Sequence, residues 1–215
     1  MKKLIALIIL FILTGCSVNP VTGQKDFVMM SENQEISLGK KYHAQVLQQT
    51  PAYKDQDLQN YVQKVGDSLS TKSHRPNLFY RFTVLDSPDV NAFALPGGYI
   101  YINRGLMAYL SSEEELAAVL GHEIGHVTAR HSVRQYSQSQ LLSILSAAVQ
   151  MNSGRTAGDI VGVASGALLA GYGREMELEA DELGAEYLYQ DGYSTEGMMK
   201  VLSVLKDQEI YSKEL

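Results

Sequence analysis

The 215-residue sequence contains a single cysteine, so no disulfide can form within the chain. It has no run rich in lysine and arginine, and so lacks the electrostatic footprint of a nucleic-acid-binding protein. It also lacks an apolar run long enough to span a bilayer, because the longest unbroken one is Leu4–Leu13. No internal repeat or low-complexity segment is present. These absences exclude disulfide-rich, repeat and nucleic-acid-binding proteins.

The first residues have the pattern of an export signal. Two lysines precede the apolar run, and Leu13-Thr-Gly-Cys16 follows it. This Leu-x-Gly-Cys sequence resembles the bacterial lipobox, in which the cysteine is lipidated and becomes the first mature residue. The resemblance implies a signal peptide at residues 1–15 and a lipid on Cys16; the plainer alternative is a secretory signal with an incidental cysteine. Ser17, at the sorting position, implies the periplasmic face of the outer membrane.

Removal of residues 1–15 leaves 200 residues, which is enough for one domain with a substantial core. The segment contains two lysines and no acidic residue, so the formal net charge changes from −6 to about −8. Membrane attachment would depend on Cys16 alone, since no basic cluster remains to bind anionic headgroups. We expect residues 16–30 to be a lipid-anchored tether and residues 31–215 to form the domain.

The hydrophobic pattern predicts a predominantly helical α+β domain with a small mixed or antiparallel sheet. Helical spacing of apolar residues predicts helices over residues 31–49 and 55–69, the first opened by a capping box. Strand patterns occur at residues 80–85, 92–95 and 99–102, with a turn between the last two. Further helices are expected from a capping box at Ser112 and Glu115 to about Gln135, over 141–151 and 160–172, over 174–181 and over 194–215.

His122-Glu-Ile-Gly-His126 is the strongest chemical signal in the chain. Residues four apart on a helix differ by about 40° of rotation, so both imidazoles face one way and can share a metal ion. Zinc accepts imidazole nitrogen, and Glu123 could take a proton from water during attack on a peptide carbonyl. The alternative is a pair of solvated histidines. His131 lies about 180° around the same predicted helix from His122, so we expect it to point away from the metal.

A catalytic zinc site needs a third protein ligand, and the acidic segment Arg174–Asp181 offers several carboxylates. On a helix, Glu177 and Asp181 share one face, while Glu175 and Glu179 share roughly the opposite one. One face could supply a carboxylate ligand and a second carboxylate that orients a ligand imidazole. Spacing does not decide between the two pairs, and a solvated acidic helix has the same pattern.

Four motifs occur in order along the chain: Asn19-Pro-Val-Thr-Gly23, Asn91-Ala-Phe-Ala-Leu-Pro-Gly-Gly98, His122-Glu-Ile-Gly-His126 and Glu177-x-x-Ala-Asp181. Together they resemble metallopeptidase family forty-eight, the gluzincins that include HtpX-like and CAAX-prenyl proteases. The likeness is greatest to the soluble periplasmic lipoprotein branch, which includes enzymes that survey outer-membrane protein assembly. It covers most of the chain that follows residue 15.

The resemblance implies a zincin-like fold and one zinc ion per chain, bound by His122, His126 and Glu177. It also implies that Glu123 is the general base and proton donor, that Asp181 supports the histidines, and that Arg174 is a basic position before the motif. An edge strand beside the metal helix would bind extended peptides through its unpaired backbone groups, with a plain structural hairpin as the alternative. The residues implied for that strand are Asn91, Ala92, Phe93, Ala94 and Leu95.

Two departures from the family pattern bear on activity. The family's catalytic domain usually continues beyond the point at which this chain stops, and residues 194–215 resemble an amphipathic helix cut near its end. The family often supplies a later histidine that stabilises the oxyanion or occupies the metal, and none follows His131. The sequence therefore indicates a zinc peptidase fold more firmly than an active peptidase.

From these features we expect a zinc endopeptidase that degrades exposed or misfolded polypeptides at the bacterial cell envelope. Unfolded outer-membrane or periplasmic proteins are the expected substrates. One alternative is a chaperone-like assembly factor of the same fold with latent or lost proteolysis. Another is an integral-membrane HtpX-like peptidase, which would need membrane spans at residues 141–151 and 160–172.

Overall fold

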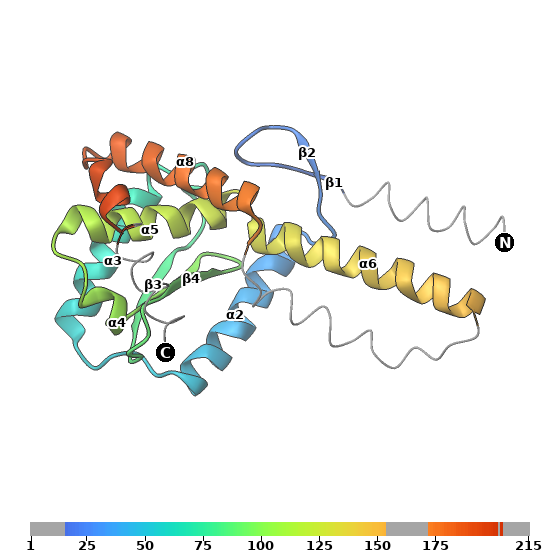
Figure 1. Ribbon diagram of the computed structural model, residues 1–215, viewed down its shortest axis with the longest axis horizontal. Helices are drawn as coiled ribbons and strands as arrows, with labels where there is room; N and C mark the ends of the chain where they lie inside the picture. The colour runs from blue at the N-terminus through green and yellow to red at the C-terminus, as the bar shows by residue number, and fades with distance from the viewer. Residues whose placement is uncertain (1–15, 154–171, 202, 204–215) are drawn as a thin grey trace.

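The computed structural model describes residues 16–153, 172–201 and 203, which form a mostly helical domain with a small sheet (Figure 1). The strands are β1 (Cys16–Val18), β2 (Lys25–Phe27), β3 (Arg81–Leu85), β4 (Ala92–Leu95) and β5 (Tyr99–Asn103). The helices are α2 (Glu32–Gln49), α3 (Gln56–Ser70), α4 (Arg104–Met107), α5 (Glu113–Thr128), α6 (His131–Ser153) and α8 (Arg174–Gln190). A short helical segment also covers residues 196–201.

The main sheet has the order β3–β5–β4, with β3 parallel and β4 antiparallel to β5. It is therefore a mixed sheet with β4 at one edge. The sequence predicted a small sheet that is either mixed or antiparallel. The β4–β5 hairpin turns through Gly97 and Gly98, whose φ angles of 78° and 91° lie in the left-handed region that favours glycine. Of the strands, β4 is the one that packs most extensively against α5.

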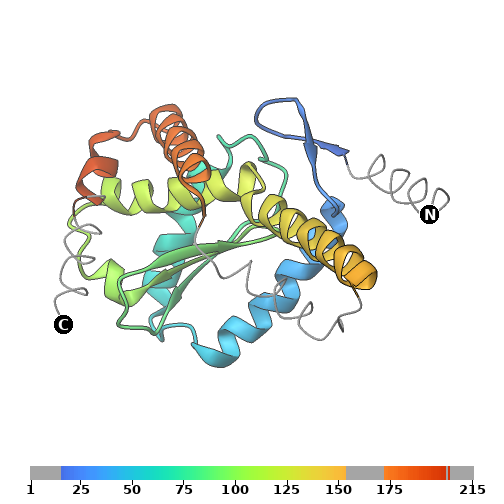
Figure 2. The ribbon, with the colours of Figure 1, turned by 45° about the vertical axis from the view of Figure 1, so that its right-hand side comes forward.

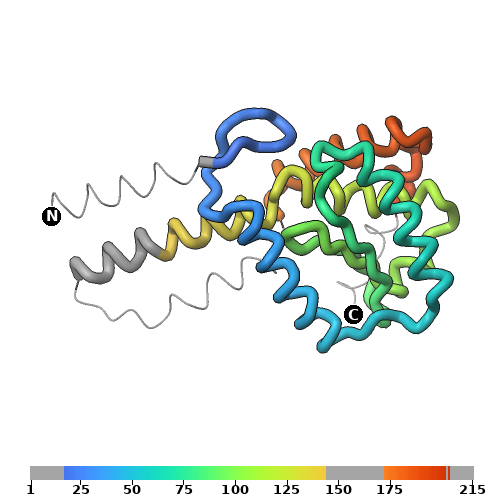
Figure 3. Tube along the Cα trace, turned by 180° about the vertical axis from the view of Figure 1, so that it is seen from behind, coloured from blue at the N-terminus to red at the C-terminus, as the bar shows by residue number. Residues whose placement is uncertain are grey.

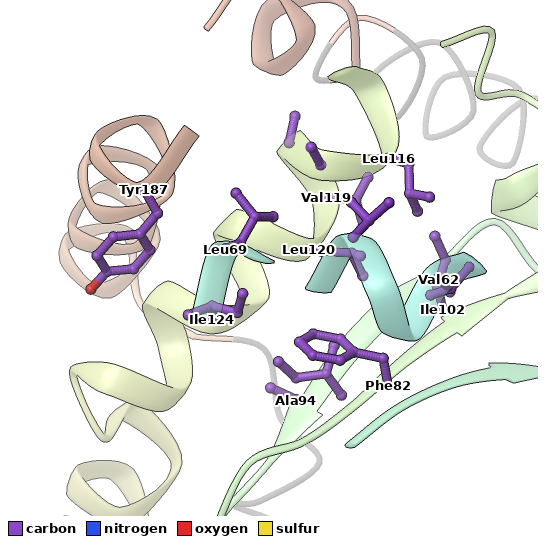
Figure 4. Close-up of a cluster of buried hydrophobic side chains, with 14 of the residues drawn as sticks. Val62, Leu69, Phe82, Ala94, Ile102, Leu116, Val119, Leu120, Ile124 and Tyr187 are labelled. Atoms are coloured by element: carbon purple, nitrogen blue, oxygen red, sulfur yellow. The ribbon is translucent and has the colours of Figure 1, made fainter. Parts of the chain in front are cut away.

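The two faces of this sheet are covered by different helices. Side chains of α3 and α5 pack on one face, where Ile102 lies beside Val62 and Phe82 lies near Leu120 (Figure 4). Helix α2 covers the other face, on which Tyr101 is fully buried. Figure 3 follows the chain from the β1–β2 hairpin through α2 to α3. The apolar periodicity that predicts these helices thus corresponds to their buried faces.

Both predicted capping boxes lie at helix starts, but only one has the full reciprocal pattern. At α2, Ser31 Oγ accepts from the Gln34 backbone N–H, and the Gln34 side chain accepts from the Ser31 N–H. At α5, Ser112 Oγ accepts from the Glu115 N–H, whereas the Glu115 carboxylate accepts from the N–H of Ser111 at 2.7 Å. The hydrogen bond to the Glu115 side chain therefore comes from the residue before the N-cap, and the start of α5 is still capped.

The prediction of one helix from Ser112 to about Gln135 is wrong at its C-terminal end. Helix α5 ends at Thr128, and α6 begins at His131. Between them Arg130 has a φ of 56°, which is left-handed and uncommon for a residue other than glycine. Arg130 is held there by hydrogen bonds from its guanidinium to Glu35 and to the Met30 carbonyl. The chain therefore changes direction immediately after the histidine motif (Figure 2).

Residues 16–30, expected to be a tether, contain a folded hairpin in which Cys16 pairs with Phe27. Its loop is closed by Asn19, whose side chain accepts from two backbone N–H groups and donates to Asp26. The following residues pack on α6: Val28 and Met30 contact Val133, and the Met29 N–H donates to Ser137 Oγ. The N-terminal segment is thus part of the folded domain from Cys16 onward.

Within the described residues, no helix is long and apolar enough to cross a membrane. The predicted 141–151 segment forms part of the longer helix α6. Residues 160–171 of the other apolar segment lie outside the described part of the chain, as do residues 1–15 and 204–215.

A buried ionic cluster joins segments that are distant in sequence. Glu35 on α2 is 1% exposed, and its carboxylate accepts from Arg75 Nη1 at 2.7 Å and from Arg130 Nε at 2.8 Å. Arg75 also donates to the Val127 carbonyl near the end of α5. Burial alone would lower the pKa of Arg75, but the charge and hydrogen bond of Glu35 outweigh it and raise the pKa. Arg75 therefore stays charged inside the protein.

We predict that Glu35→Ala destabilises the domain by about 3–5 kcal/mol, because it removes the buried carboxylate that two guanidinium groups share. The free energy of unfolding in urea measures this effect. Glu32→Ala is the matched control on the same helix: Glu32 is 61% exposed and lies 3.4 Å from Arg75. Its loss should cost about 1 kcal/mol or less. Equal, small effects of the two substitutions would contradict the role assigned to Glu35.

Candidate metal site

The site lies where α5 and α8 pack side by side, and small residues allow the close approach (Figure 1). A Cβ on Gly125 would lie 2.7 Å from the Ala180 carbonyl oxygen, and one on Gly184 would lie 2.9 Å from the His122 backbone nitrogen. Neither position has room for a side chain. The face of α8 that contains Ala180 and Gly184 therefore packs against the histidine motif.

Three potential ligand atoms converge between the helices. His122 Nε2 and His126 Nε2 are 2.9 Å apart, and the Glu177 carboxylate oxygens lie 3.6 Å from the first and 3.8 Å from the second. Tetrahedral zinc with bonds of about 2.0–2.1 Å would place its ligand atoms about 3.3 Å apart, within the range of these distances. Two imidazole nitrogens and a carboxylate oxygen form a known zinc-binding set. These residues can therefore hold a metal ion.

Asp181 lies behind the first histidine, on the same helix as Glu177. Its carboxylate oxygen is 2.8 Å from His122 Nδ1. A proton on Nδ1 would be donated to Asp181, which leaves the lone pair of Nε2 directed toward His126 and Glu177. Burial lowers the pKa of His122, but the hydrogen bond to Asp181 and the nearby carboxylate of Glu177 outweigh it and raise the pKa. Of the two carboxylate pairs left open by spacing, the packing brings Glu177 and Asp181 to the motif.

The second histidine is more deeply buried than the first. Burial lowers the pKa of His126, and the neighbouring His122 and His131 lower it further. A neutral imidazole is the form that binds metal. The ring of Tyr172 stacks on His126 with centroids 4.1 Å apart and an interplanar angle of 20°. The sequence gives no signal for this contact, because Tyr172 precedes α8 and belongs to no motif.

Glu123 lies next to the first histidine on α5 and is 6% exposed. Burial raises the pKa of its carboxyl group to about 7, with a charged His122 opposing the shift and Glu177 adding to it. A carboxyl group with a pKa near neutrality can both accept and release a proton under physiological conditions.

His131, expected to point away from the metal, is not among the three residues that could hold the ion, but the expectation that it lies on the opposite side of the helix from the motif is wrong. It assumed a continuous helix, whereas the turn at Arg130 brings His131 back beside His126. The two Nδ1 atoms are 2.8 Å apart. On its other side, His131 Nε2 is 3.0 Å from a carboxylate oxygen of Glu179. Helical periodicity could not have indicated this contact, since no sequence signal marks a left-handed arginine.

The remaining predicted residues lie around the site in different ways. Arg174 begins α8 with an exposed side chain, and Glu175 after it is also exposed. The segment Asn91–Leu95 contains the edge strand β4 and approaches α5. Within the described residues, the outer edge of β4 pairs with no other strand. Phe93 stacks on Tyr101 of the neighbouring strand.

Comparison with known proteins gives a family match and several named relatives. The sequence pattern of peptidase family M48 matches residues 56–213. The beta-barrel assembly-enhancing protease of Yersinia pestis is 29% identical over 204 residues, covering 89% of this chain and 42% of the relative. The protein of the same name in Escherichia coli K12 is 30% identical over 195 residues, covering 85% and 40%. Mitochondrial metalloendopeptidase OMA1 of Arabidopsis thaliana is 33% identical over 140 residues, covering 65% and 28%.

The chain thus spans about two fifths of the length of the two assembly-enhancing proteases. The family match itself covers most of the chain and includes both the histidine motif on α5 and the acidic motif on α8. The chain therefore belongs to peptidase family M48.

Proposed function

We propose that this chain is a zinc-dependent endopeptidase. The observation that carries the proposal is the convergence of His122, His126 and Glu177 on one point, with Glu123 beside it on the same helix. A bound zinc ion would lower the pKa of water and polarise the peptide carbonyl. The family match and the relatives named as metalloendopeptidase or protease support the same activity.

Glu123 has the chemistry needed to move the proton in peptide hydrolysis. Its carboxylate takes a proton from the attacking water as the water oxygen bonds to the carbonyl carbon. It then gives that proton to the leaving amine nitrogen as the C–N bond breaks, so the carboxylate is regenerated. Asp181 holds His122 in the orientation that directs Nε2 toward the other two ligands.

The unpaired edge of β4 is the proposed place for the substrate backbone. An extended peptide there would form main-chain hydrogen bonds that do not depend on its sequence. Binding of this kind suits exposed or misfolded polypeptides. The relatives named as beta-barrel assembly-enhancing proteases extend the proposal to unfolded outer-membrane or periplasmic proteins as substrates.

Metal analysis tests the zinc site directly. We expect the purified protein to contain about one zinc ion per chain and to digest casein, with both lost after chelation and restored by added zinc. A serine-protease inhibitor serves as the control and should have no effect. Cleavage that persists without metal contradicts the mechanism, and bound zinc without cleavage favours the chaperone-like alternative.

Substitution Glu123→Gln separates metal binding from catalysis. We expect zinc content to stay near that of the wild type and cleavage to fall by about 10²–10⁴-fold, because the amide cannot take the proton from water. Glu114→Gln, at an exposed position on the same helix, is the matched control and should retain activity. If cells that carry Glu123→Gln clear misfolded envelope proteins as well as cells with the wild type, proteolysis is not the basis of that role.

We also propose that residues 1–15 are removed and that a lipid on Cys16 holds the protein at the periplasmic face of the outer membrane. The support is the Leu-x-Gly-Cys sequence with the export pattern before it and Ser17 after it.

In a bacterium with two membranes, wild-type protein should incorporate labelled fatty acid and sediment with the outer membrane. Cys16→Ala should lose the label, because it removes the thiol that carries the lipid. Thr14→Ala is the control, since it alters only the variable position of the motif and should still be labelled. An equally labelled Cys16→Ala variant would disprove the anchor.

A further inference from the structure

His126 uses both ring nitrogens. Its Nε2 points to His122 and Glu177, and its Nδ1 lies 2.8 Å from Nδ1 of His131. His131 is fully buried, and its Nε2 lies 3.0 Å from Glu179 Oε2. Arg134 Nη1 donates to the same glutamate oxygen at 2.8 Å. A continuous chain of polar contacts therefore connects His126, a proposed zinc ligand, through His131 to the carboxylate of Glu179.

The hydrogen positions in this chain follow from metal binding, so the inference rests on the proposed function. A ligating Nε2 must carry a lone pair, which places the proton of the neutral His126 ring on Nδ1. That N–H requires an acceptor 2.8 Å away, and the acceptor is Nδ1 of His131. The proton of His131 is then on Nε2, from which it is donated to Glu179. With both rings neutral, this arrangement gives every donor an acceptor.

We propose that His131 is a positioning residue for the metal site. It accepts the N–H of His126 and donates to Glu179, and so fixes the tautomer and the ring orientation of His126. Each ligand histidine is then supported by a carboxylate of α8: His122 directly by Asp181, and His126 through His131 by Glu179. Such supporting partners raise the metal affinity of the ligands that they orient.

The location of His131 suits this role. It is the first residue of α6 and follows Arg130, whose left-handed backbone is held by the buried Glu35. Arg134, one turn further along α6, keeps the Glu179 carboxylate in place and also lies 3.5 Å from Asp26 in the N-terminal hairpin. The acceptor for His126 is therefore held by α6, α8 and the hairpin together.

Zinc affinity tests the proposal without recourse to activity. In competition with a chromophoric chelator, His131→Leu should bind zinc about 10–100-fold more weakly than wild type, because it removes the acceptor for His126. His131→Asn should recover much of the loss, since its amide oxygen can accept near the position of Nδ1. His43→Leu is the control: His43 also makes a hydrogen bond, partly buried, to Tyr101, but it lies on α2 across the sheet. Its zinc affinity should equal that of wild type.

A measurement on the unaltered protein covers the case in which His131→Leu does not fold. In zinc-loaded protein with ¹⁵N-labelled histidine, NMR should show protons on His126 Nδ1 and on His131 Nε2. A proton on His131 Nδ1, or wild-type affinity in a folded His131→Leu, overturns the positioning role and leaves the zinc site intact. Wild-type protein that binds no zinc overturns the proposed function and the positioning role together.

Discussion

The arrangement of the chain around the histidine motif depends on the ion pairs of one buried carboxylate, that of Glu35. It neutralises two guanidinium groups that the fold removes from water, one before β3 and one at the corner between α5 and α6. An isolated buried charge of either sign would be strongly destabilising, so the three groups are stable only together. These contacts hold the start of α2 at a fixed distance from the end of α5, where Arg75 donates to the Val127 carbonyl. They also hold it near the β4–β5 turn, where the Gly97 N–H donates to Glu35.

Close packing of two helices then determines the chemistry between them. The glycines of α5 and α8 allow the backbones to approach so closely that side chains of α8 lie directly over the histidine motif. A larger residue at Gly125 would have to move one backbone away from the other, because its nearest neighbours are backbone atoms. The metal-binding geometry is therefore a property of the interface between the helices, and neither helix could provide it alone.

Features decided locally could be predicted from the sequence. The caps and apolar spacing indicated α2, α3 and the start of α5, and the alternating segments indicated the strands of the main sheet. The end of α5 could not be predicted, because it depends on the contact between Arg130 and Glu35, 95 positions apart in the chain. The position of His131 follows from that contact. Spacing alone offered two carboxylate pairs on the acidic helix. The family resemblance indicated Glu177 and Asp181, and the packing of α8 on α5 brings that pair to the motif. The three-residue strands of the N-terminal hairpin are too short to show a pattern.

If Cys16 carries the proposed lipid, the N-terminal hairpin limits where the protein can act. Cys16 is already the first residue of β1, so a lipid attached to it would leave no flexible residues between the acyl chains and the folded domain. A flexible linker would let an anchored enzyme sample a volume that grows with linker length. Without one, the distance from the bilayer to the histidines of an anchored protein would be set by the dimensions of the domain itself. The protein would then reach polypeptide segments that emerge close to the membrane surface, and exclude those held farther away.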